Sequence, residues 1–289
     1  MPTIPDLHTH STASDGTLTP TELIVRAGAA GVRVLALTDH DNTDGLAEAA
    51  QAADAQGLIL IPGVEISVTW NALTVHVVGL RLDPANAQLQ AGLARLMAFR
   101  VWRAEEIGRR LAKHGIEDAY AGARALARGR LVGRTHFARF LVKQGRAADT
   151  NEVFRHFLTR GNPGHVPGDW ASLEEAVGWI RGAGGLAVIA HPARYDLTRA
   201  RMQRLLGEFR ELGGVGLEVV TGSHSRDETL TFARQAREQH LRASAGSDYH
   251  GPENPWIELG RLPSLPDGCV PIWRDWPELV LQEPCAAYG

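Results

Sequence analysis

Histidine and carboxylate residues recur in this chain at the points where predicted strands end. They form short clusters that span almost the whole sequence: Asp6-Leu7-His8-Thr9-His10, Asp39-His40, Glu65, His76, His191-Pro192 and Asp248-Tyr249-His250. The C-terminal ends of strands in a barrel or an open α/β sheet lie on one side, so we expect these side chains to converge. Imidazole nitrogens and carboxylate oxygens are ligands of Zn²⁺, Mn²⁺ and Fe²⁺, which polarise a substrate oxygen. The pattern therefore predicts a metal centre in a metallohydrolase.

Apolar runs alternate with segments of helical periodicity along the chain. Five runs bounded by turn signals are predicted strands: 33–37, 58–61, 73–80, 186–190 and 216–220. Five helices are expected around them: 20–30, 43–56, 172–183, 198–212 and 225–239. Three of these helices open with a capping-box pattern, at Thr19, Ser172 and Ser225. Repeated strand and helix units indicate an α/β protein with a parallel sheet or barrel.

The middle of the chain has a different pattern. A long helical run from Pro84 to His114 is followed by Gly- and Arg-rich helical segments without clear strands. We expect a helical insertion at 100–165 that divides one barrel into a first part, 1–99, and a second part, 166–289.

Composition excludes several classes of protein. The formal charge of −3 and the pI of about 6.5 give no global basic field for binding a long nucleic acid. Cys269 and Cys285 are the only cysteines, so a disulfide framework or thiolate zinc site is not expected. No apolar stretch is long enough to span a bilayer. We expect a cytoplasmic protein that does not associate with membranes.

Taken in order, the clusters resemble the polymerase-and-histidinol-phosphatase (PHP) family. The resemblance spans nearly the whole chain and rests on these motifs: Asp6-Leu7-His8-Thr9-His10-Ser11, Thr38-Asp39-His40-Asp41, Gly63-Val64-Glu65, His76, His191-Pro192 and Ser247-Asp248-Tyr249-His250. It implies a distorted (β/α)7 barrel with a centre of two or three metals that hydrolyses phosphoesters. The insertion segment Gly133-Arg134-Thr135-His136 resembles the branch of nucleoside 3′,5′-bisphosphate phosphatases and 5′-to-3′ exoribonucleases.

The resemblance also implies a set of metal ligands. One ion is expected on His8, His10, Glu65 and Asp248, a second on Glu65, His76 and His191, and a third on Asp15, His40 and His250. Mn²⁺ is the expected ion, with Fe²⁺ or Zn²⁺ as alternatives, because imidazoles and carboxylates suit all three. An Asp in a turn such as Ser14-Asp15-Gly16 also commonly satisfies backbone amides, so a turn role for Asp15 is the alternative.

Several further residues are candidates for catalysis and substrate binding. A hydroxide bridging two metals would attack phosphorus in line. Asp15 and His224 are the candidate catalytic residues, and either His224 or a metal-bound water would donate a proton to the leaving alkoxide. Four side chains are candidate substrate contacts: Ser14, Arg134, His136 and Arg194. Arginine matches phosphate with a bidentate fork. Three carboxylates are expected to orient ligating imidazoles from behind: Asp6, Asp39 and Asp41.

These expectations predict a phosphatase that removes the 3′-phosphate of nucleoside 3′,5′-bisphosphates, such as adenosine 3′,5′-bisphosphate, and releases AMP and phosphate. A 5′-to-3′ exoribonuclease acting on short RNA and a histidinol phosphatase are the alternatives among enzymes. A metal-stabilised module of a DNA polymerase is the alternative without catalysis. A degenerate, non-catalytic binding module would be expected to lack ligands, and every predicted ligand is present in this sequence.

Overall fold

The computed structural model of the protein describes residues 4–280, so Cys285 lies outside the described residues. Six strands form one sheet in sequence order: β1 (Val34–Leu37), β2 (Ile59–Trp70), β3 (Leu73–Leu80), β4 (Leu186–Ile189), β5 (Gly216–Thr221) and β6 (Arg242–Gly246). Strands β1 and β2 pair in parallel, as do β4 with β5 and β5 with β6. Strand β3 runs antiparallel to both of its neighbours.

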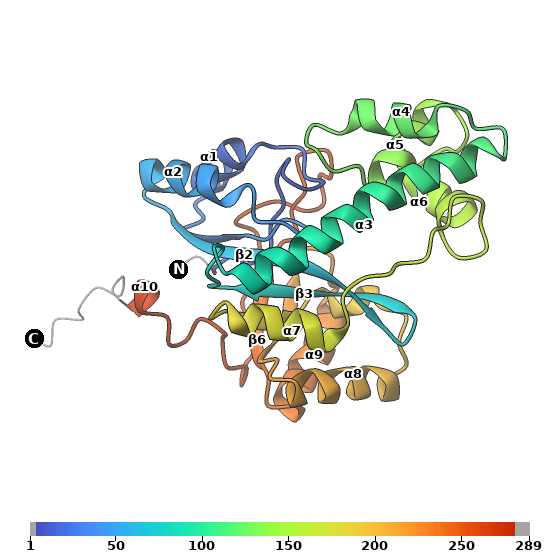
Figure 1. Cartoon of the computed structure of the whole chain (residues 1–289). Helices are drawn as coiled ribbons and strands as arrows, with labels where there is room; N and C mark the ends of the chain where they lie inside the picture. The colour runs from blue at the N-terminus through green and yellow to red at the C-terminus, as the bar shows by residue number, and fades with distance from the viewer. Residues whose placement is uncertain (1–3, 281–289) are drawn as a thin grey trace, which may run out of the picture.

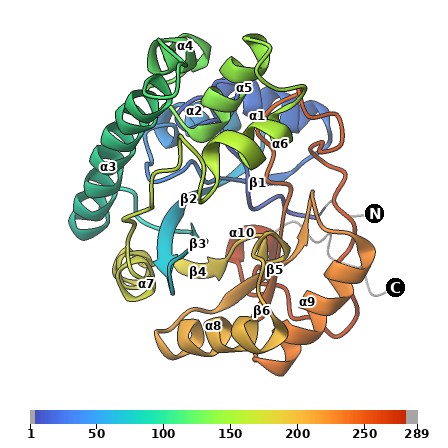
Figure 2. The same cartoon turned by 90° about the vertical axis from the view of Figure 1, so that its right-hand side faces the viewer.

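The N-terminal segment lies between the first and last strands of the sheet. The backbone N–H of Asp6 donates to Val34 of β1, and that of Leu7 donates to Ala245 of β6, at 3.0 and 2.9 Å. Isolated bridges pair Asp6 with Leu35 and Thr9 with Tyr249. Because this segment connects the two edges, the sheet curls into a distorted barrel with helices around it (Figure 2). The predicted α/β barrel is confirmed.

Helices cover the outside of the barrel close to where the sequence predicts them. They are α1 (Pro20–Ala29), α2 (Leu46–Gln56), α7 (Leu173–Gly182), α8 (Arg199–Glu211) and α9 (Arg226–Glu238). The predicted capping boxes at Thr19, Ser172 and Ser225 are all formed. A single 3₁₀ turn, η2 (Pro192–Arg194), follows β4, and α10 (Pro277–Val280) ends the described chain. Within residues 4–280, no helix is both long and apolar enough to cross a membrane.

The sheet is mixed rather than parallel throughout, because β3 runs antiparallel to β2 and β4. Strands β2 and β3 form a hairpin joined by Asn71 and Ala72, which both have positive φ angles, 46° and 61°. Two consecutive left-handed residues make the tight turn that joins antiparallel strands. The predicted run 58–61 is only the start of β2, which continues to Trp70. Strand β6 was not among the predicted strands.

The middle of the chain forms a helical unit beside the barrel (Figure 1). It contains α4 (Ala119–Leu126), α5 (Arg134–Lys143), α6 (Thr150–Val153) and the π-helical turn η1 (Phe154–Leu158). The long helix α3 (Ala87–Ala112) packs Leu89 and Leu93 into the barrel core and Ile107 and Leu111 into a separate apolar cluster of the insertion. Helix α3 therefore crosses the predicted boundary, and the limits at 100 and 165 stay a prediction.

The loop 127–133 attaches the insertion to the barrel a second time. Arg128 donates to the carbonyl oxygen of Thr17 at 2.7 Å, and Arg130 pairs with Asp44 at 2.6 Å. A Cβ atom at Gly129 would lie 1.7 Å from the carbonyl oxygen of Thr12, so only glycine allows this approach. The loop therefore holds the start of α5 against the barrel segment that contains Asp15.

The packing of α3 on α7 provides a test of the fold. A Cβ atom at Gly92 would lie 2.6 Å from the indole ring of Trp179, so Gly92→Ala should force the two helices apart. We expect the free energy of unfolding to fall by about 1–3 kcal/mol, as for overpacked cores. Gly207 of α8 has no neighbour within 4 Å of such an atom. Gly207→Ala should instead raise stability by roughly 0.5–1 kcal/mol. Urea denaturation measures both, and equal midpoints would contradict this packing.

Candidate metal centre and substrate cavity

The nine predicted ligands converge at one end of the barrel. Three groups of side chains have potential ligand atoms within 4.8 Å of one another: His8, His10 and Glu65; His40, Glu65 and His76; and His10, Asp15, His40 and His250. The other two predicted ligands adjoin these groups. His191 Nε2 lies 2.9 Å from Glu65 Oε1, and Asp248 Oδ1 lies 3.2 Å from His10 Nε2.

Glu65 is the centre of this cluster. Its carboxylate is buried on β2, with Oε1 2.8 Å from His76 Nδ1 and Oε2 2.8 Å from His40 Nδ1. Burial raises the pKa of Glu65, but His40, His76 and His8 outweigh burial and hold this pKa well below its usual range. Glu65 is therefore an anion that several imidazoles share.

Asp15 and His250 form a second contact in the cluster. Asp15 Oδ1 lies 3.2 Å from His250 Nε2 and 3.9 Å from His40 Nε2. Burial raises the pKa of Asp15, but His250 and His40 outweigh it, so the pKa lies well below its ordinary value. Burial lowers the pKa of His40 to about 4, although Glu65 and Asp15 oppose the shift. His40 is therefore a neutral imidazole near pH 7, the form that binds metals.

Unusual backbone turns at the strand ends direct these side chains inward. His191 after β4 and Asp248 after β6 have positive φ angles, 25° and 56°, and Asp41 after His40 has one of 52°. Such angles are uncommon outside glycine and cluster at functional sites. His8 and His10 alternate with Thr9, whose hydroxyl donates to the carbonyl of Ala36 instead. The alternation places both imidazoles on the inner side.

Carboxylates behind the cluster hold the chain in place. Asp39 accepts hydrogen bonds from the Ser11 amide at 2.8 Å and the Ser14 hydroxyl at 2.5 Å. Asp6 accepts one from the Ser247 amide, and Asp41 accepts one from the Ser67 amide. Within the described residues, none of these three carboxylates forms a hydrogen bond to an imidazole. They were expected to orient the imidazoles directly, but they position the ligands through backbone contacts instead.

Glu218 bonds directly to a predicted ligand, and it was not among the residues predicted from the sequence. It accepts from His8 Nδ1 at 2.7 Å and from the backbone N–H of His191 at 2.5 Å. Its position offered a signal, because a carboxylate inside an apolar buried strand is uncommon without a partner.

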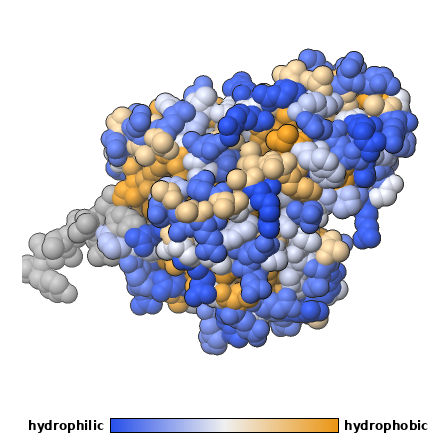
Figure 3. All heavy atoms as spheres, in the orientation of Figure 1, coloured by the Kyte–Doolittle hydropathy of each residue, from blue (hydrophilic) through white to orange (hydrophobic). Residues whose placement is uncertain are grey.

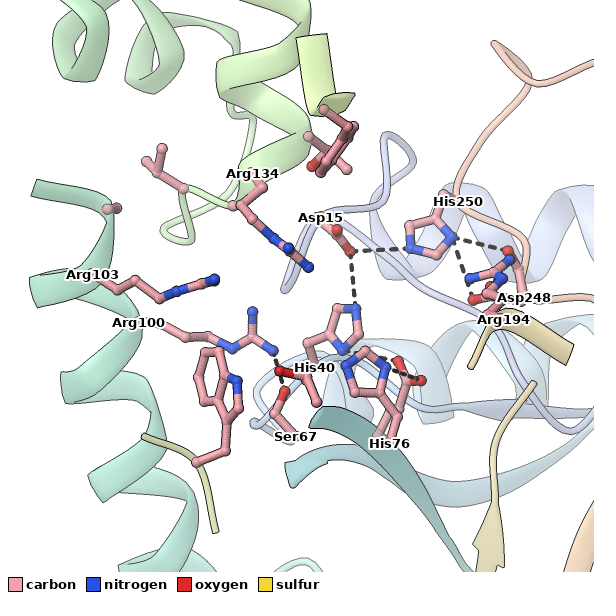
Figure 4. Close-up of a pocket in the computed structure, with 18 of the residues that line it drawn as sticks. Asp15, His40, Ser67, His76, Arg100, Arg103, Arg134, Arg194, Asp248 and His250 are labelled. Atoms are coloured by element: carbon pink, nitrogen blue, oxygen red, sulfur yellow. Dashed lines mark hydrogen bonds and ion pairs between the residues drawn. The ribbon is translucent and has the colours of Figure 1, made fainter. Parts of the chain in front are cut away.

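A cavity of about 210 Å³ opens over the cluster. Predicted ligands form one wall, and Figure 4 shows three arginines facing them: Arg100 and Arg103 from α3, and Arg134 from the start of α5. Apolar side chains complete the lining, among them Ile107, Val132, Phe154 and Trp170.

The arginine wall is rich in uncompensated positive charge. Among residues 4–280, neither Arg103 nor Arg134 pairs with a carboxylate, and Arg103 donates only to the carbonyl of Val166. Burial, followed by repulsion from Arg134 and Arg100, lowers the pKa of Arg103 to about 9. Burial and Arg100 also lower the pKa of Arg134. Arg100 alone is paired, with Asp41 at 2.6 Å. The wall therefore favours an anionic ligand. Arg134 was predicted from the sequence, whereas Arg100 and Arg103 were not.

The other predicted substrate and catalytic residues lie in different surroundings. Arg194 lines the cavity and pairs with Asp248 at 2.5 Å. Ser14 binds Asp39, and His136 Nδ1 accepts the Gly133 amide at the start of α5. His224 Nδ1 lies 3.1 Å from the carbonyl oxygen of Val219, and its ring stacks on Phe232. The side chains that line the cavity do not include Ser14, His136 or His224, so their functional roles stay predictions.

Comparison with known sequences agrees with this geometry. The model of the PHP domain matches residues 6–159. A 3′,5′-nucleoside bisphosphate phosphatase of Chromobacterium violaceum is 50% identical over 278 residues, which cover 96% of this chain and 98% of that protein. The 5′-3′ exoribonuclease Rnm of Escherichia coli is 45% identical, covering 94% of this chain and 93% of its own length.

Solved structures give the same result. An amidohydrolase from Chromobacterium violaceum, solved with sulfate and no metal, matches with a TM-score of 0.89 and 51% identity over 93% of this chain and 94% of that one. A structure from Bifidobacterium adolescentis matches with a TM-score of 0.80 and 29% identity, covering 90% and 92% of the two chains. Sequence, fold and cluster agree, and the chain belongs to the PHP family of metal-dependent phosphoesterases.

Proposed function

We propose that this protein hydrolyses the 3′-phosphate of nucleoside 3′,5′-bisphosphates, such as adenosine 3′,5′-bisphosphate, and releases AMP and phosphate. One observation carries the proposal: a single cavity has metal-ligand side chains on one wall and arginines on the other. A nucleoside bisphosphate has two phosphates separated by a ribose, so it can contact both walls at once. The relative from Chromobacterium violaceum bears the name of this activity.

The proposed centre contains two to three divalent ions held by the nine predicted ligands. Buried oxygens of Asp15, Glu65 and Asp248 lack a hydrogen bond of normal geometry among the described residues, and cations would satisfy them. Imidazoles with carboxylates suit Mn²⁺, the proposed ion, as well as Fe²⁺ and Zn²⁺. When bound, such ions polarise a phosphoryl oxygen and lower the pKa of water. The choice of Mn²⁺ and a cytoplasmic location rest on the sequence alone.

The arginines are assigned to the phosphate that is not hydrolysed. Among the described residues, Arg134 and Arg103 hold positive charge in a half-buried wall without carboxylate partners, and a 5′-phosphate would compensate both. Ile107, Val132 and Phe154 give the nucleoside an apolar surface between the walls. Arg194 adjoins Asp248 on the ligand wall, where it can bind the 3′-phosphate. His224 remains the candidate proton donor, and Asp15 serves as a ligand with a candidate catalytic role.

Charge on the insertion supports short RNA as an alternative substrate. Residues 100–165 carry 14 Lys and Arg against 6 Asp and Glu, a formal charge of +8 in a chain whose total is −3. Arg124, Arg128 and Arg130 are exposed there, and hydrophilic side chains cover much of the insertion surface in Figure 3. Such a surface attracts a phosphate backbone. Histidinol phosphate is disfavoured because its amine would face arginines.

Selective loss of ions should follow from removing single carboxylates. Asp15 belongs to one group of ligand atoms, whereas Glu65 belongs to two. After loading with Mn²⁺ and gel filtration, we expect Asp15→Asn to retain about one ion fewer than the wild-type protein and Glu65→Gln to lose more than one. Elemental analysis measures the content, with circular dichroism as the folding control. Equal metal content in the two variants would contradict the shared position of Glu65.

The substrate assignment is tested by phosphate release from adenosine 3′,5′-bisphosphate. We expect Mn²⁺-loaded protein to produce 5′-AMP and phosphate, with slower release from 3′-AMP, 5′-AMP and histidinol phosphate, because these lack one phosphate. His191→Ala should abolish the activity. Mononucleotide release from short 5′-phosphorylated RNA, faster than turnover of the bisphosphate, would move the assignment to exoribonuclease. Metal-loaded protein inactive on every compound would reject both.

Arg134→Ala should separate binding of the second phosphate from chemistry. Loss of a charge-assisted hydrogen bond, about 1.5–3 kcal/mol, predicts a KM for adenosine 3′,5′-bisphosphate raised roughly 10- to 150-fold. The KM for 3′-AMP should change little, because 3′-AMP has no second phosphate. Lys143→Ala, at the exposed end of the same helix, is the matched control. A parallel rise for both substrates would show that Arg134 does not contact the 5′-phosphate.

A further inference from the structure

Glu218 joins two parts of the metal centre that come from distant segments. It is 1% exposed on β5, and each of its oxygens already accepts one hydrogen bond. Oε1 lies 2.7 Å from Nδ1 of His8, and Oε2 lies 2.5 Å from the backbone nitrogen of His191. In the centre proposed above, these two histidines belong to different ions. Both contacts lie on the outer side of the ligands, and Glu218 belongs to none of the three groups of potential ligand atoms, so it lies behind the ligands rather than among them.

The first contact selects which nitrogen of His8 faces the centre. A proton on Nδ1 donates to Glu218, so Nε2 carries the lone pair, and this nitrogen faces the centre 3.1 Å from Nε2 of His10. Nε2 lies 3.4 Å from Glu65 Oε2 and 3.5 Å from Asp248 Oδ1, on the side where a metal would bind. The other tautomer would place its proton there and could not bind a cation.

The second contact holds an unfavourable backbone conformation. His191 has φ of 25° and ψ of 60° and precedes Pro192. A left-handed angle is uncommon for a residue with a Cβ, and a following proline restricts the backbone further towards extended conformations. The charged acceptor at 2.5 Å stabilises this turn, which directs His191 Nε2 to Glu65.

The local chain is shaped to allow the arrangement. Strand β5 has an irregular register between Glu218 and Val220, which redirects side chains at this point. Gly246 on β6 leaves room, because a Cβ there would lie 3.0 Å from Glu218 Oε1 and 2.3 Å from His8 Cβ.

We propose that Glu218 is a positioning residue that fixes the tautomer of His8 and the left-handed turn of His191, and so aligns ligands of two ions with one carboxylate. This inference rests on the metal centre of the proposed function but not on the identity of the substrate.

Glu218→Gln is the decisive variant because it preserves size but not hydrogen-bonding capacity. The amide has one accepting oxygen and one donating nitrogen, so it cannot accept from both His8 and His191. We expect the dissociation constant of Mn²⁺ to rise roughly 10- to 100-fold, as for other partners of ligating histidines. Calorimetric titration of the folded protein measures it. Glu208→Gln is the matched control, since Glu208 on α8 accepts from Trp70 in a different part of the fold.

A second measurement needs no variant. In Zn²⁺-loaded wild-type protein labelled with ¹⁵N-histidine, NMR should show His8 protonated at Nδ1 with a strongly hydrogen-bonded proton. Protonation at Nε2, or unchanged Mn²⁺ affinity in Glu218→Gln, would overturn the proposal. A Glu218→Gln protein that fails to fold leaves the NMR result to decide. Wild-type protein that binds Mn²⁺ but does not hydrolyse the bisphosphate would reject the proposed substrate and leave the role of Glu218 intact.

Discussion

The shared carboxylate of Glu65 is the interaction on which the geometry of the site depends. A buried carboxylate costs several kcal/mol unless charged or hydrogen-bonding partners surround it. Here His40, His76 and His191 surround it, each with a ring nitrogen within 2.9 Å. These partners follow β1, lie on β3 and follow β4. Because the Glu65 carboxylate contacts all three imidazoles, it holds the ends of these strands at one point. The geometry of the site therefore depends on the geometry of the barrel.

Small residues are as important to this arrangement as the ligands. The N-terminal segment with His8 and His10 must lie directly beside β6, where Gly246 permits contact with His8 and the neighbouring residues are Ala and Ser. A larger side chain at Gly246 would displace the backbone that supports two imidazoles. The same principle applies at Gly129, where the loop 127–133 meets Thr12. Close backbone approaches therefore position both walls of the cavity: Gly246 packs directly against the ligand His8, and Gly129 acts through the loop that carries the start of α5.

Periodicity and capping signals were sufficient to predict most helices and five strands, and the ligands followed because polar residues at strand ends converge. The rest depends on tertiary context. The β2–β3 hairpin turns at Asn71 and Ala72, and Ala at the second position is not a turn signal. Apart from Arg242, strand β6 consists of small residues with low β-propensity, and it forms because it pairs with β5 on one side and the N-terminal segment on the other. Arg100 and Arg103 resemble ordinary arginines on a solvated helix. Only tertiary contacts bring them to the cavity: both pack on Trp170, Arg100 pairs with Asp41, and Arg103 donates to Val166.

Two positive walls explain how such a site can discriminate between phosphate esters. The arginine wall is destabilised by its own charge, and the ligand wall would gain positive charge from its ions. A substrate with two phosphates compensates both walls, whereas a monophosphate leaves one of them unpaired in a buried environment. Leaving a desolvated charge without a partner costs more free energy than a solvent-exposed contact would contribute. Selectivity therefore arises because a monophosphate leaves the charges of one wall unpaired. A nucleic-acid strand that places successive phosphates against the two walls meets the same condition. The distance between the walls therefore selects substrates by the spacing of their phosphates. It does not select them by the number of nucleotides.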